Sequence, residues 1–600
     1  MSGSTGLWLG ARQAVWQDAI EPSQVLAGVV VYPDPSNPFY LYQTRVATLL
    51  HPLGAAALRV GFEEISLARL FSAGLGAVCF AAIGTWVWGL THNLPFAVSV
   101  SPILVLLDPR DWGVRYPLSL MDSNTYGVLG LGLLMLALGL VASGRAFSGG
   151  FVAGLAPAFH IVLGGWCLLL LAVSLAWRGA QVPRRPAVLR GALLGLGLSG
   201  AFFSLHLVRA PARPRIDPGL ASSYVSTFRG DEWHQGPLDP SLPPVLLLLS
   251  VSALAGGRLS VTREGALPGT APLVLLRMTL IATVLGLAFA GTHTALGQWS
   301  PRLFIVAMPC RLLNVAVLAA FLSLLGLLWN ARAHPLAMVN LAILVGSCLA
   351  LRLYGVPDAD ALMLRAAVLS SLALLLTSTS TEATAGRALP GAAVPLALLM
   401  LDGVLGHADR VASAAAAVTL LCLVVRAMIR RAPPEPFGEA HRRLWAERAL
   451  LVAFVSTGAW AAAQVVRRPP FEFRDRTNDS VLERASRGSG FLLASSGLGG
   501  YLQHLTRRPM LLDTEQIDGL PYVPETGPAI ERILRRVYGV PFFDVALHER
   551  ELWQQRPAEE WAEIGAELQV TNVITEAGWR LQLPEVGRND LYALYSIPQG

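Results

Sequence analysis

Arg311 is a basic residue inside an apolar stretch, MPCRLLN, and Asn314 follows it three residues later. Burying an ionisable side chain within a membrane segment costs free energy, so such a residue is a candidate for a functional role. The planar guanidinium carries five N–H donors and suits a phosphate or diphosphate. An ion pair between helices, with Asp402 as partner, explains Arg311 equally well. Both residues are therefore candidate site residues.

Carboxylates gather in the stretches that connect the apolar runs, often beside aromatic residues. The three sets are Asp18, Glu21 and Asp34; Asp108, Asp111 and Asp122; and Asp231 and Glu232 together with His234. A carboxylate that accepts a hydroxyl proton, close to a cation that holds a leaving phosphate, is what sugar transfer from a phospholipid carrier requires. Each acid taken alone is better explained as an ordinary solvated loop charge.

His160 lies in the sequence AGLAPAFHIVLGG, within a long apolar run. Gly154, Pro157 and the pair Gly164-Gly165 interrupt this run and predict a break in the helix. An imidazole at such a break could contact an anion. The alternative for a single histidine is a hydrogen-bonded packing role.

The composition excludes several reaction classes. All 46 basic residues are arginine, so the chain has no lysine for a Schiff base or for a Walker A phosphate loop. The five cysteines all lie in apolar segments and form neither a disulfide framework nor a CxxC motif. The spacing in DEWH (231–234) does not match a dedicated zinc site. We therefore predict no metal site and no cofactor, with a divalent cation as the one candidate.

The elements that must position these residues are membrane helices. Of the 600 residues, 53% are hydrophobic and only 14% are charged, whereas soluble proteins have about 25% charged residues. We expect apolar spans at 66–90, 94–108, 125–143, 147–177, 189–208, 243–257, 273–293, 303–328, 335–352, 361–377, 390–408, 411–430 and 447–467. The run 147–177 is too long for one span, and we predict two short helices that meet near His160. The predicted fold class is a polytopic α-helical membrane protein with about 13–14 membrane helices.

Arginine clusters orient these spans, because short cytoplasmic loops collect positive charge. Placing the clusters at 178–190 and 426–443 in the cytoplasm puts residues 1–65, the loops 109–124 and 209–242 and the C-terminal tail on the outer side. The net charge of +6 follows from this topology, so we expect no nucleic-acid partner. The outer position of residue 1 without a preceding span favours a missing upstream helix.

The C-terminal tail has a different pattern from the rest of the chain. Short strands are predicted at 491–496, 509–513, 570–577 and 591–597, and helices near 498–507, 525–538 and 557–567. This alternation predicts a small α/β domain. We therefore divide the chain into an outer acidic segment with an interfacial helix (1–65), a multi-span membrane domain (66–468) and an extracytoplasmic α/β domain (469–600).

This layout resembles the GT-C superfamily of integral membrane glycosyltransferases, including uncharacterised bacterial relatives. The matching features are the acidic first outer segment, the acids of the second outer loop, His160 in the short helices that follow, and an outer C-terminal α/β domain. The tail has no WWDYG-like motif, and the first segment has no adjacent pair of acids.

The resemblance implies a polyprenyl-phosphate-linked sugar as donor, a loop carboxylate as base, and basic groups that stabilise the leaving phosphate. Asp18 or Glu21 is then the expected catalytic base, followed by Asp34. The expected substrate-binding residues are Asp108, Asp111, Asp122, His160, Glu232, His234, Arg311 and Asp402. The implied partners are the lipid-linked donor and membrane lipids, in a bacterial inner membrane.

Two other function classes fit the same sequence. A transporter or flippase for a lipid-linked or anionic substrate would use the broken helices around 154–165 together with Arg311. A non-catalytic assembly factor would instead bind a partner protein through the surface of residues 469–600. The first alternative depends on the intramembrane charges, whereas the second does not.

Overall fold

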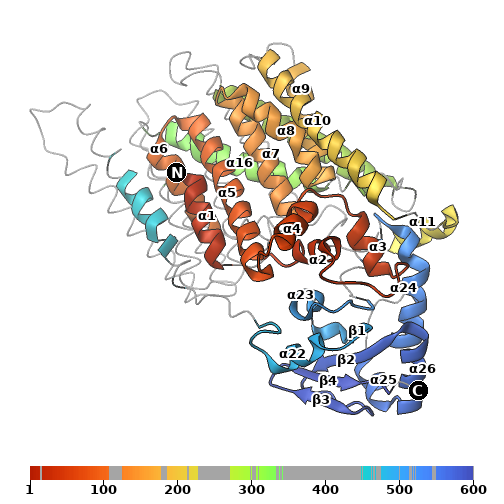
Figure 1. Cartoon of the computed structure of the whole chain (residues 1–600). Helices are drawn as coiled ribbons and strands as arrows, with labels where there is room; N and C mark the ends of the chain where they lie inside the picture. Colours follow the sequence, from red (N-terminus) through yellow and green to blue (C-terminus); the bar gives the residue numbers. More distant parts are fainter. Residues whose placement is uncertain are drawn as a thin grey trace, which may run out of the picture.

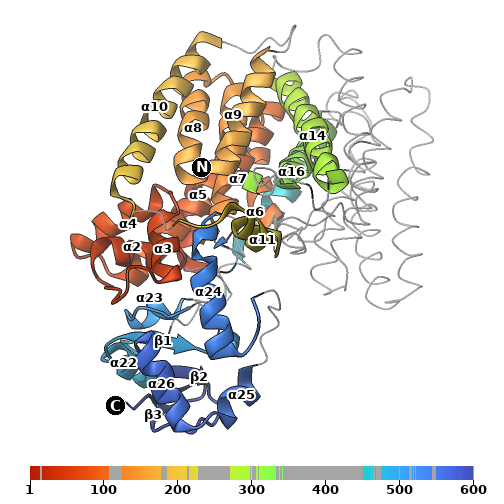
Figure 2. The same cartoon turned by 90° about the vertical axis from the view of Figure 1, so that its right-hand side faces the viewer.

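The computed structural model describes residues 1–13, 16–106, 125–176, 185–211, 215–227, 271–296, 310–330, 451–460, 474–498, 501–512, 522–542 and 549–598, with a few single residues between them. Long helices form one part of the molecule and a small α/β unit forms the other (Figure 1). Between them lie three short helices, α2 (Ile20–Ala27), α3 (Pro38–Arg45) and α4 (Leu50–Arg59), in both views (Figure 1 and Figure 2).

The long helices follow the apolar runs of the sequence closely. They are α1 (Ser2–Gln13), α5 (Glu64–Thr91), α6 (Leu94–Leu106), α7 (Tyr126–Ala142), α8 (Ala146–Phe159), α9 (Ile161–Ala176), α10 (Arg185–Arg209), α14 (Ala271–Leu296) and α16 (Cys310–Asn330). Among the described residues, four helical segments are long and apolar enough to cross a membrane: α5, α10, Val274–His293 and Arg311–Asn330. The chain is an integral membrane protein.

The predicted fold class, a helical membrane protein with a C-terminal α/β unit, is confirmed. The span predicted at 303–328 is helical from Cys310, and the one predicted at 447–467 contains an apolar helix at Leu451–Trp460. The spans predicted at 243–257, 335–352, 361–377, 390–408 and 411–430 lie outside the described residues.

The long run 147–177 is two helices, as predicted. Helix α8 ends at Phe159 and α9 begins at Ile161, while His160 between them has an extended backbone (φ −149°, ψ 102°). Pro157 lies in the last turn of α8 and cannot donate a backbone hydrogen bond there. The helix break therefore places one histidine between two short apolar helices.

Small residues let neighbouring helices approach to backbone contact. A Cβ atom built on Gly150 of α8 would lie 2.1 Å from the carbonyl oxygen of Val188 in α10, and one on Gly154 would lie 2.2 Å from that of Ala192. Helix α1 packs on α5 in the same way, through Gly6. This is the small-xxx-small packing of membrane helices, where close van der Waals contact takes the role that hydrophobic burial has in water.

Helix α1 was not among the predicted elements. Its 12 residues are too few for a predicted span, and residues 1–65 were expected to form an outer segment. In the structure this helix lies beside α5 and α6 in the helical part (Figure 1).

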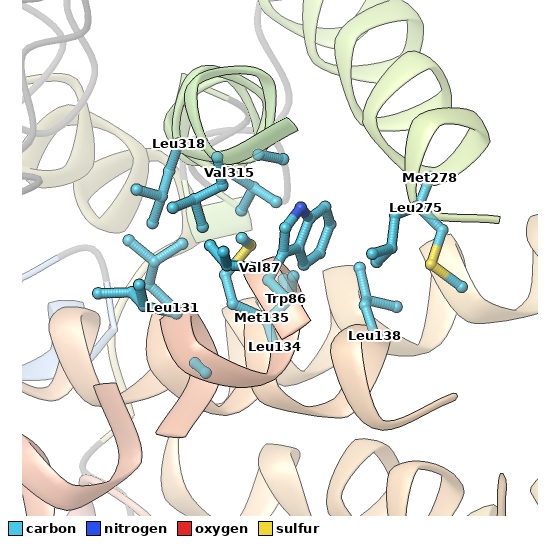
Figure 3. Packing of buried hydrophobic residues seen from close by; sticks show 14 of the residues in the cluster. Trp86, Val87, Leu131, Leu134, Met135, Leu138, Leu275, Met278, Val315 and Leu318 are labelled. Carbon is cyan, nitrogen blue, oxygen red and sulfur yellow. The ribbon is translucent and has the colours of Figure 1, made fainter. Parts of the chain in front are cut away.

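Helix α16 is the centre of the apolar core. All of the membrane-length window in this helix is buried within the molecule. Figure 3 shows Val315 and Leu318 of α16 facing Trp86 and Val87 of α5, with Leu131 of α7 beside them. The indole N–H of Trp86 also donates to Ser323 on α16 (3.4 Å). The face of α16 that begins with Arg311 is therefore in the interior of the bundle.

The C-terminal unit is a four-stranded mixed sheet with the order β1-β2-β4-β3. Strand β1 (Phe491–Ala494) is parallel to β2 (Val570–Glu576), which pairs antiparallel with β4 (Tyr592–Ser596); β3 (Glu585–Arg588) pairs antiparallel with β4. The helices are α22 (Ser480–Ser486), α23 (Leu502–Thr506), α24 (Gly527–Ile533), α25 (Glu549–Gln555) and α26 (Ala558–Leu568). Of the predicted strands, 509–513 forms only a single bridge, between Met510 and Leu492.

A segment that follows α10 also reaches the C-terminal unit. Helix α11 (Pro218–Thr227) lies next to α24 (Figure 2), and the hydroxyl of Tyr224 donates to Glu531 (2.7 Å). The ring of Tyr224 packs against Phe542 at 4.5 Å between centroids. The C-terminal unit therefore contacts segments that precede and follow the first membrane helices.

Candidate functional site

The N-terminal end of α7 carries a short chain of hydrogen bonds. The hydroxyl of Tyr126 donates to the main-chain carbonyl of Asp18 (3.0 Å) and lies 2.8 Å from Nε2 of His51. Because the single hydroxyl proton goes to Asp18, Nε2 of His51 must be the donor in the second bond. The Tyr126 ring also packs against buried Trp16, at 5.3 Å between centroids. These contacts hold the turn that carries Asp18 against the membrane helices.

The intramembrane arginine reaches the helix break. Nη1 of Arg311 lies 2.9 Å from Nε2 of His160. His160 packs against α7 at Gly130, one helical turn beyond Tyr126, where an added Cβ would come within 2.9 Å of the histidine Cβ. His160 and the main chain of Asp18 therefore contact adjacent turns of α7. Arg311 reaches His160 from α16.

His160 has two tautomers with different consequences for this contact. Its Nδ1 lies 3.3 Å from the backbone N–H of Leu163, which can only donate. When Nδ1 accepts that hydrogen bond, a neutral imidazole carries its proton on Nε2, facing the guanidinium. The guanidinium can only donate, so in this tautomer the two N–H groups do not bond to each other and both are left to donate to a third group. In the other tautomer, Nε2 accepts from Arg311 directly.

Asn314 adds a buried amide to the same face of α16. Arg311 is 5% exposed and Asn314 is 2% exposed, and residues three apart on a helix share a face. Neither the nitrogen nor the oxygen of the Asn314 side chain has a hydrogen-bond partner among the residues that the structure describes. A buried polar group without a partner costs about 1–3 kcal/mol, so this amide favours a polar ligand at the site.

Glu21 has a different environment from Asp18, although the two acids are only three residues apart. It is 5% exposed, and its Oε1 accepts the backbone N–H of His504 (3.2 Å). Its main-chain oxygen accepts from Nε2 of Gln503 (3.0 Å). Glu21 therefore faces the C-terminal unit, whereas the Asp18 turn is tied to α7.

Asp34 closes a local turn between α2 and α3. Its carboxylate accepts the backbone N–H and the hydroxyl of Ser36, at 2.8 and 2.7 Å. The next residue, Asn37, caps α3 by accepting the N–H of Phe39 (2.8 Å). These bonds give Asp34 a structural role as the start of the loop that leads into α3.

The structure thus brings Arg311 to His160 and ties the main chain of Asp18 to α7 through Tyr126, whereas the carboxylate of Glu21 binds the C-terminal unit and that of Asp34 binds Ser36. The other predicted site residues lie outside the described residues: Asp108, Asp111, Asp122, Glu232, His234 and Asp402. Two further residues of the site, His51 and Tyr126, were not predicted. His51 lies among apolar residues in HPLGAAALRV, and nothing in the sequence around Tyr126 marks that residue.

Metal-ligating residues do not cluster in the part of the chain that the structure describes. No group there of three or more histidine, cysteine, aspartate or glutamate side chains could hold a metal ion.

The segment between α2 and α5 is joined to the C-terminal unit by buried polar contacts. The Glu64 carboxylate accepts two bonds from Arg507, at 2.5 and 2.9 Å, and one from Arg476 (3.3 Å). Arg45 pairs with Glu525 at 2.8 Å, with both side chains about 5% exposed. This interface fixes how the acidic outer segment sits above the helices.

His504 lies within the same interface and is 1% exposed. Burial, which disfavours the charged imidazolium, lowers the pKa of His504 to about 4. The nearby Glu64 carboxylate opposes this shift and the Arg476 guanidinium adds to it. His504 is therefore neutral at pH 7.

Neither a protein-family model nor a curated protein matches the chain. Among solved structures, it is similar to the arabinofuranosyltransferase AftD from mycobacteria, with 12% identity and a TM-score of 0.44, over 100% of this chain and 40% of that one. It is also similar to ArnT from Cupriavidus metallidurans bound to undecaprenyl phosphate, with 15% identity and a TM-score of 0.40, over 99% and 96% of the two chains. Both are GT-C membrane glycosyltransferases, the superfamily that the sequence layout resembles. The chain spans 40% of the length of the AftD structure.

Proposed function

We propose that the chain is a membrane glycosyltransferase that moves a sugar from a polyprenyl-phosphate-linked donor to an acceptor on the outer side of the cytoplasmic membrane. The observation that carries the proposal is the buried Arg311 in contact with His160, beside the amide of Asn314, which has no hydrogen-bond partner in the part of the chain that the structure describes. A phosphate inside the membrane domain would accept from the guanidinium, the amide and the Nε2–H tautomer of the imidazole. Such charge-assisted bonds are about twice as strong as neutral ones.

Asp18 is the base in this proposal. Its main chain is held by Tyr126, one turn from the glycine against which His160 packs, and its side chain keeps accessible surface. The carboxylate takes the proton of the acceptor hydroxyl as the hydroxyl oxygen attacks the anomeric carbon. The bond from that carbon to the phosphate oxygen breaks, and its electron pair stays on the phosphate. Arg311 and His160 stabilise the negative charge that develops there.

The lipid-binding step can be tested without knowing the sugar. Undecaprenyl phosphate is added to the purified full chain in nanodiscs, and bound lipid is counted by native mass spectrometry. We expect Arg311→Met to weaken binding by about a hundredfold and Arg311→Lys to weaken it less, because lysine keeps the charge but not the planar fork. The matched control is Arg277→Met on α14, which should bind as the parent does. Equal binding by the Arg311 and Arg277 variants would contradict the proposal.

The chemical step is tested with Asp18→Asn. The amide cannot take the acceptor proton, so transfer from a set of radiolabelled undecaprenyl-phosphate sugars should be lost while lipid binding is retained. Retained transfer in the Asp18, Glu21 and Asp34 amide variants alike would remove the carboxylate base from the mechanism.

A transporter or flippase is the second candidate, and the break between α8 and α9 favours it. Discontinuous helices that meet near a buried charge are typical of substrate sites in secondary transporters. Movement of the labelled lipid across proteoliposomes, with its sugar–phosphate bond intact and no product formed, would favour this candidate over transfer.

A further inference from the structure

A single side chain of the C-terminal unit contacts three separate places in the outer acidic segment. Gln503 on α23 is fully buried, and its Nε2 donates to the main-chain oxygen of Glu21 in α2 (3.0 Å). Its Oε1 accepts from the hydroxyl of Tyr32 in the α2–α3 connection (2.5 Å). The amide also pairs with that of Gln43 in α3, at 3.3 and 3.4 Å. One amide therefore uses both its donor and its acceptor to hold α2, α3 and the connection between them.

Other contacts of the same kind surround Gln503. The backbone N–H of His504 donates to Glu21, and the amide of Asn37 donates to the carbonyl oxygen of Leu511 (2.8 Å). Both are buried, and buried hydrogen bonds are difficult to exchange for water. The outer segment is therefore held on the C-terminal unit in one fixed position.

The turn that carries Asp18 is held at both of its ends. At one end, Tyr126 binds the main-chain oxygen of Asp18. At the other end, Gln503 binds the main-chain oxygen of Glu21, in the first turn of α2. Only two residues separate these points, so the main chain from Asp18 to Glu21 has little freedom to move while both bonds are made.

We infer that Gln503 is a positioning residue, which fixes the Asp18 turn from the C-terminal unit. The inference rests on the proposed function, because it assigns the positioned group the role of base. We expect α2 and the turn before it to lose order when Gln503 is changed. This loss can be measured separately from catalysis.

The first test is hydrogen–deuterium exchange of the full chain in nanodiscs. Gln503→Met keeps the side-chain length and removes both hydrogen-bonding groups. We expect exchange of peptides covering 16–45 to rise by about tenfold, with peptides of β2 and β4 unchanged. The matched control, Gln582→Met, alters an exposed glutamine of the same unit and should leave both regions as in the parent. Unchanged exchange at 16–45 in Gln503→Met, or an equal rise in β2 and β4, would overturn the inference.

A double-mutant cycle checks that Gln503 acts through the contacts described. Tyr32→Phe removes one hydroxyl and should raise exchange at 16–45 by about threefold on its own. In the Gln503→Met background the same change should add nothing, because its partner is already gone. Additive effects of the two changes would show that the hydrogen bond is not the link.

Undecaprenyl phosphate binding then separates the inference from the proposed function. Gln503→Met should keep the lipid affinity within about twofold of the parent and lower the transfer rate by about tenfold at saturating donor. Arg311→Met should show the reverse, with weak lipid binding and parental exchange at 16–45. If Arg311→Met binds lipid normally while the exchange results hold, the proposed function fails and the positioning role stands. If Gln503→Met changes exchange but not the transfer rate, the positioning role in catalysis fails.

Discussion

Two buried amides in different regions of the molecule, Gln503 and Asn314, differ in how completely their hydrogen bonds are made. At the interface with the C-terminal unit, Gln503 uses its donor and its acceptor, and Glu64 binds two arginines. In the interior of the helical bundle, Asn314 is as deeply buried but has no partner among the described residues. Native proteins satisfy most of their buried polar groups, so an unsatisfied one needs an explanation. Gln503 holds two parts of the protein together, whereas we interpret Asn314 as a residue that binds a ligand.

The largest effect is expected where the interface loses one member of a buried ion pair. Arg45→Met leaves the carboxylate of Glu525 buried without its partner, which should lower the free energy of unfolding by about 3–5 kcal/mol. Denaturant unfolding of the full chain in detergent measures this. The double variant with Glu525→Leu should recover much of the loss, because no uncompensated charge remains. A loss of less than about 1 kcal/mol in the single variant would mean that the pair is hydrated in solution.

Acid should weaken the interface through His504. Its pKa is lowered to about 4 in the folded protein, from 6.5 for the free side chain, so the unfolded chain binds the proton more readily between these values. The contribution of His504 to the free energy of unfolding is therefore fully present above about pH 6.5 and is lost as the pH drops toward 4. At pH 5 the loss from this residue is about 2 kcal/mol. The measurement is the unfolding midpoint at pH 7 and pH 5 for the parent and for His504→Gln. An equally steep pH dependence in the variant would assign the effect to other groups.

The smallest change in stability is also the most direct test of the comparison. Asn314→Leu replaces an unpartnered amide with an apolar side chain of similar size, so the protein should become more stable by about 1 kcal/mol. Gln503→Met should instead lower the stability, since it removes bonds that are made. Thermal unfolding without added lipid measures whether each variant is more or less stable than the parent. Undecaprenyl phosphate should bind Asn314→Leu more weakly. A destabilised Asn314→Leu would show that its amide already has a partner.

The sequence predicted the features that depend on local chemistry. The break at His160 could be predicted because proline and glycine interrupt helices wherever they occur. Most membrane helices could be predicted because a span needs about 20 apolar residues. Strand β3 was missed because EVGR is polar and partly exposed and carries no strand pattern.

The features that depend on distant contacts could not be predicted. Helix α1 is short, and only its close approach to α5 keeps it in the helical part. The separate environments of Asp18 and Glu21 also have no local signal, since Gln503, which fixes Glu21, is 482 positions away. Tyr126 connects His51, which precedes it by 75 positions, to Asp18, which precedes it by 108. Spacing along the chain grouped the acids but could not say which of them binds the C-terminal unit and which is tied to α7.

The contact between Glu21 and Gln503 also has a consequence for the order of synthesis. The ribosome makes the Asp18 turn before the membrane helices that follow it, and α23 after them. Until α23 has folded, α2 lacks its hydrogen bonds to Gln503 and His504. A nascent chain therefore carries the acidic segment through most of its own insertion into the membrane without the fixed geometry of the finished site. A unit that is made after the membrane helices therefore completes the attachment of a turn that is made before them.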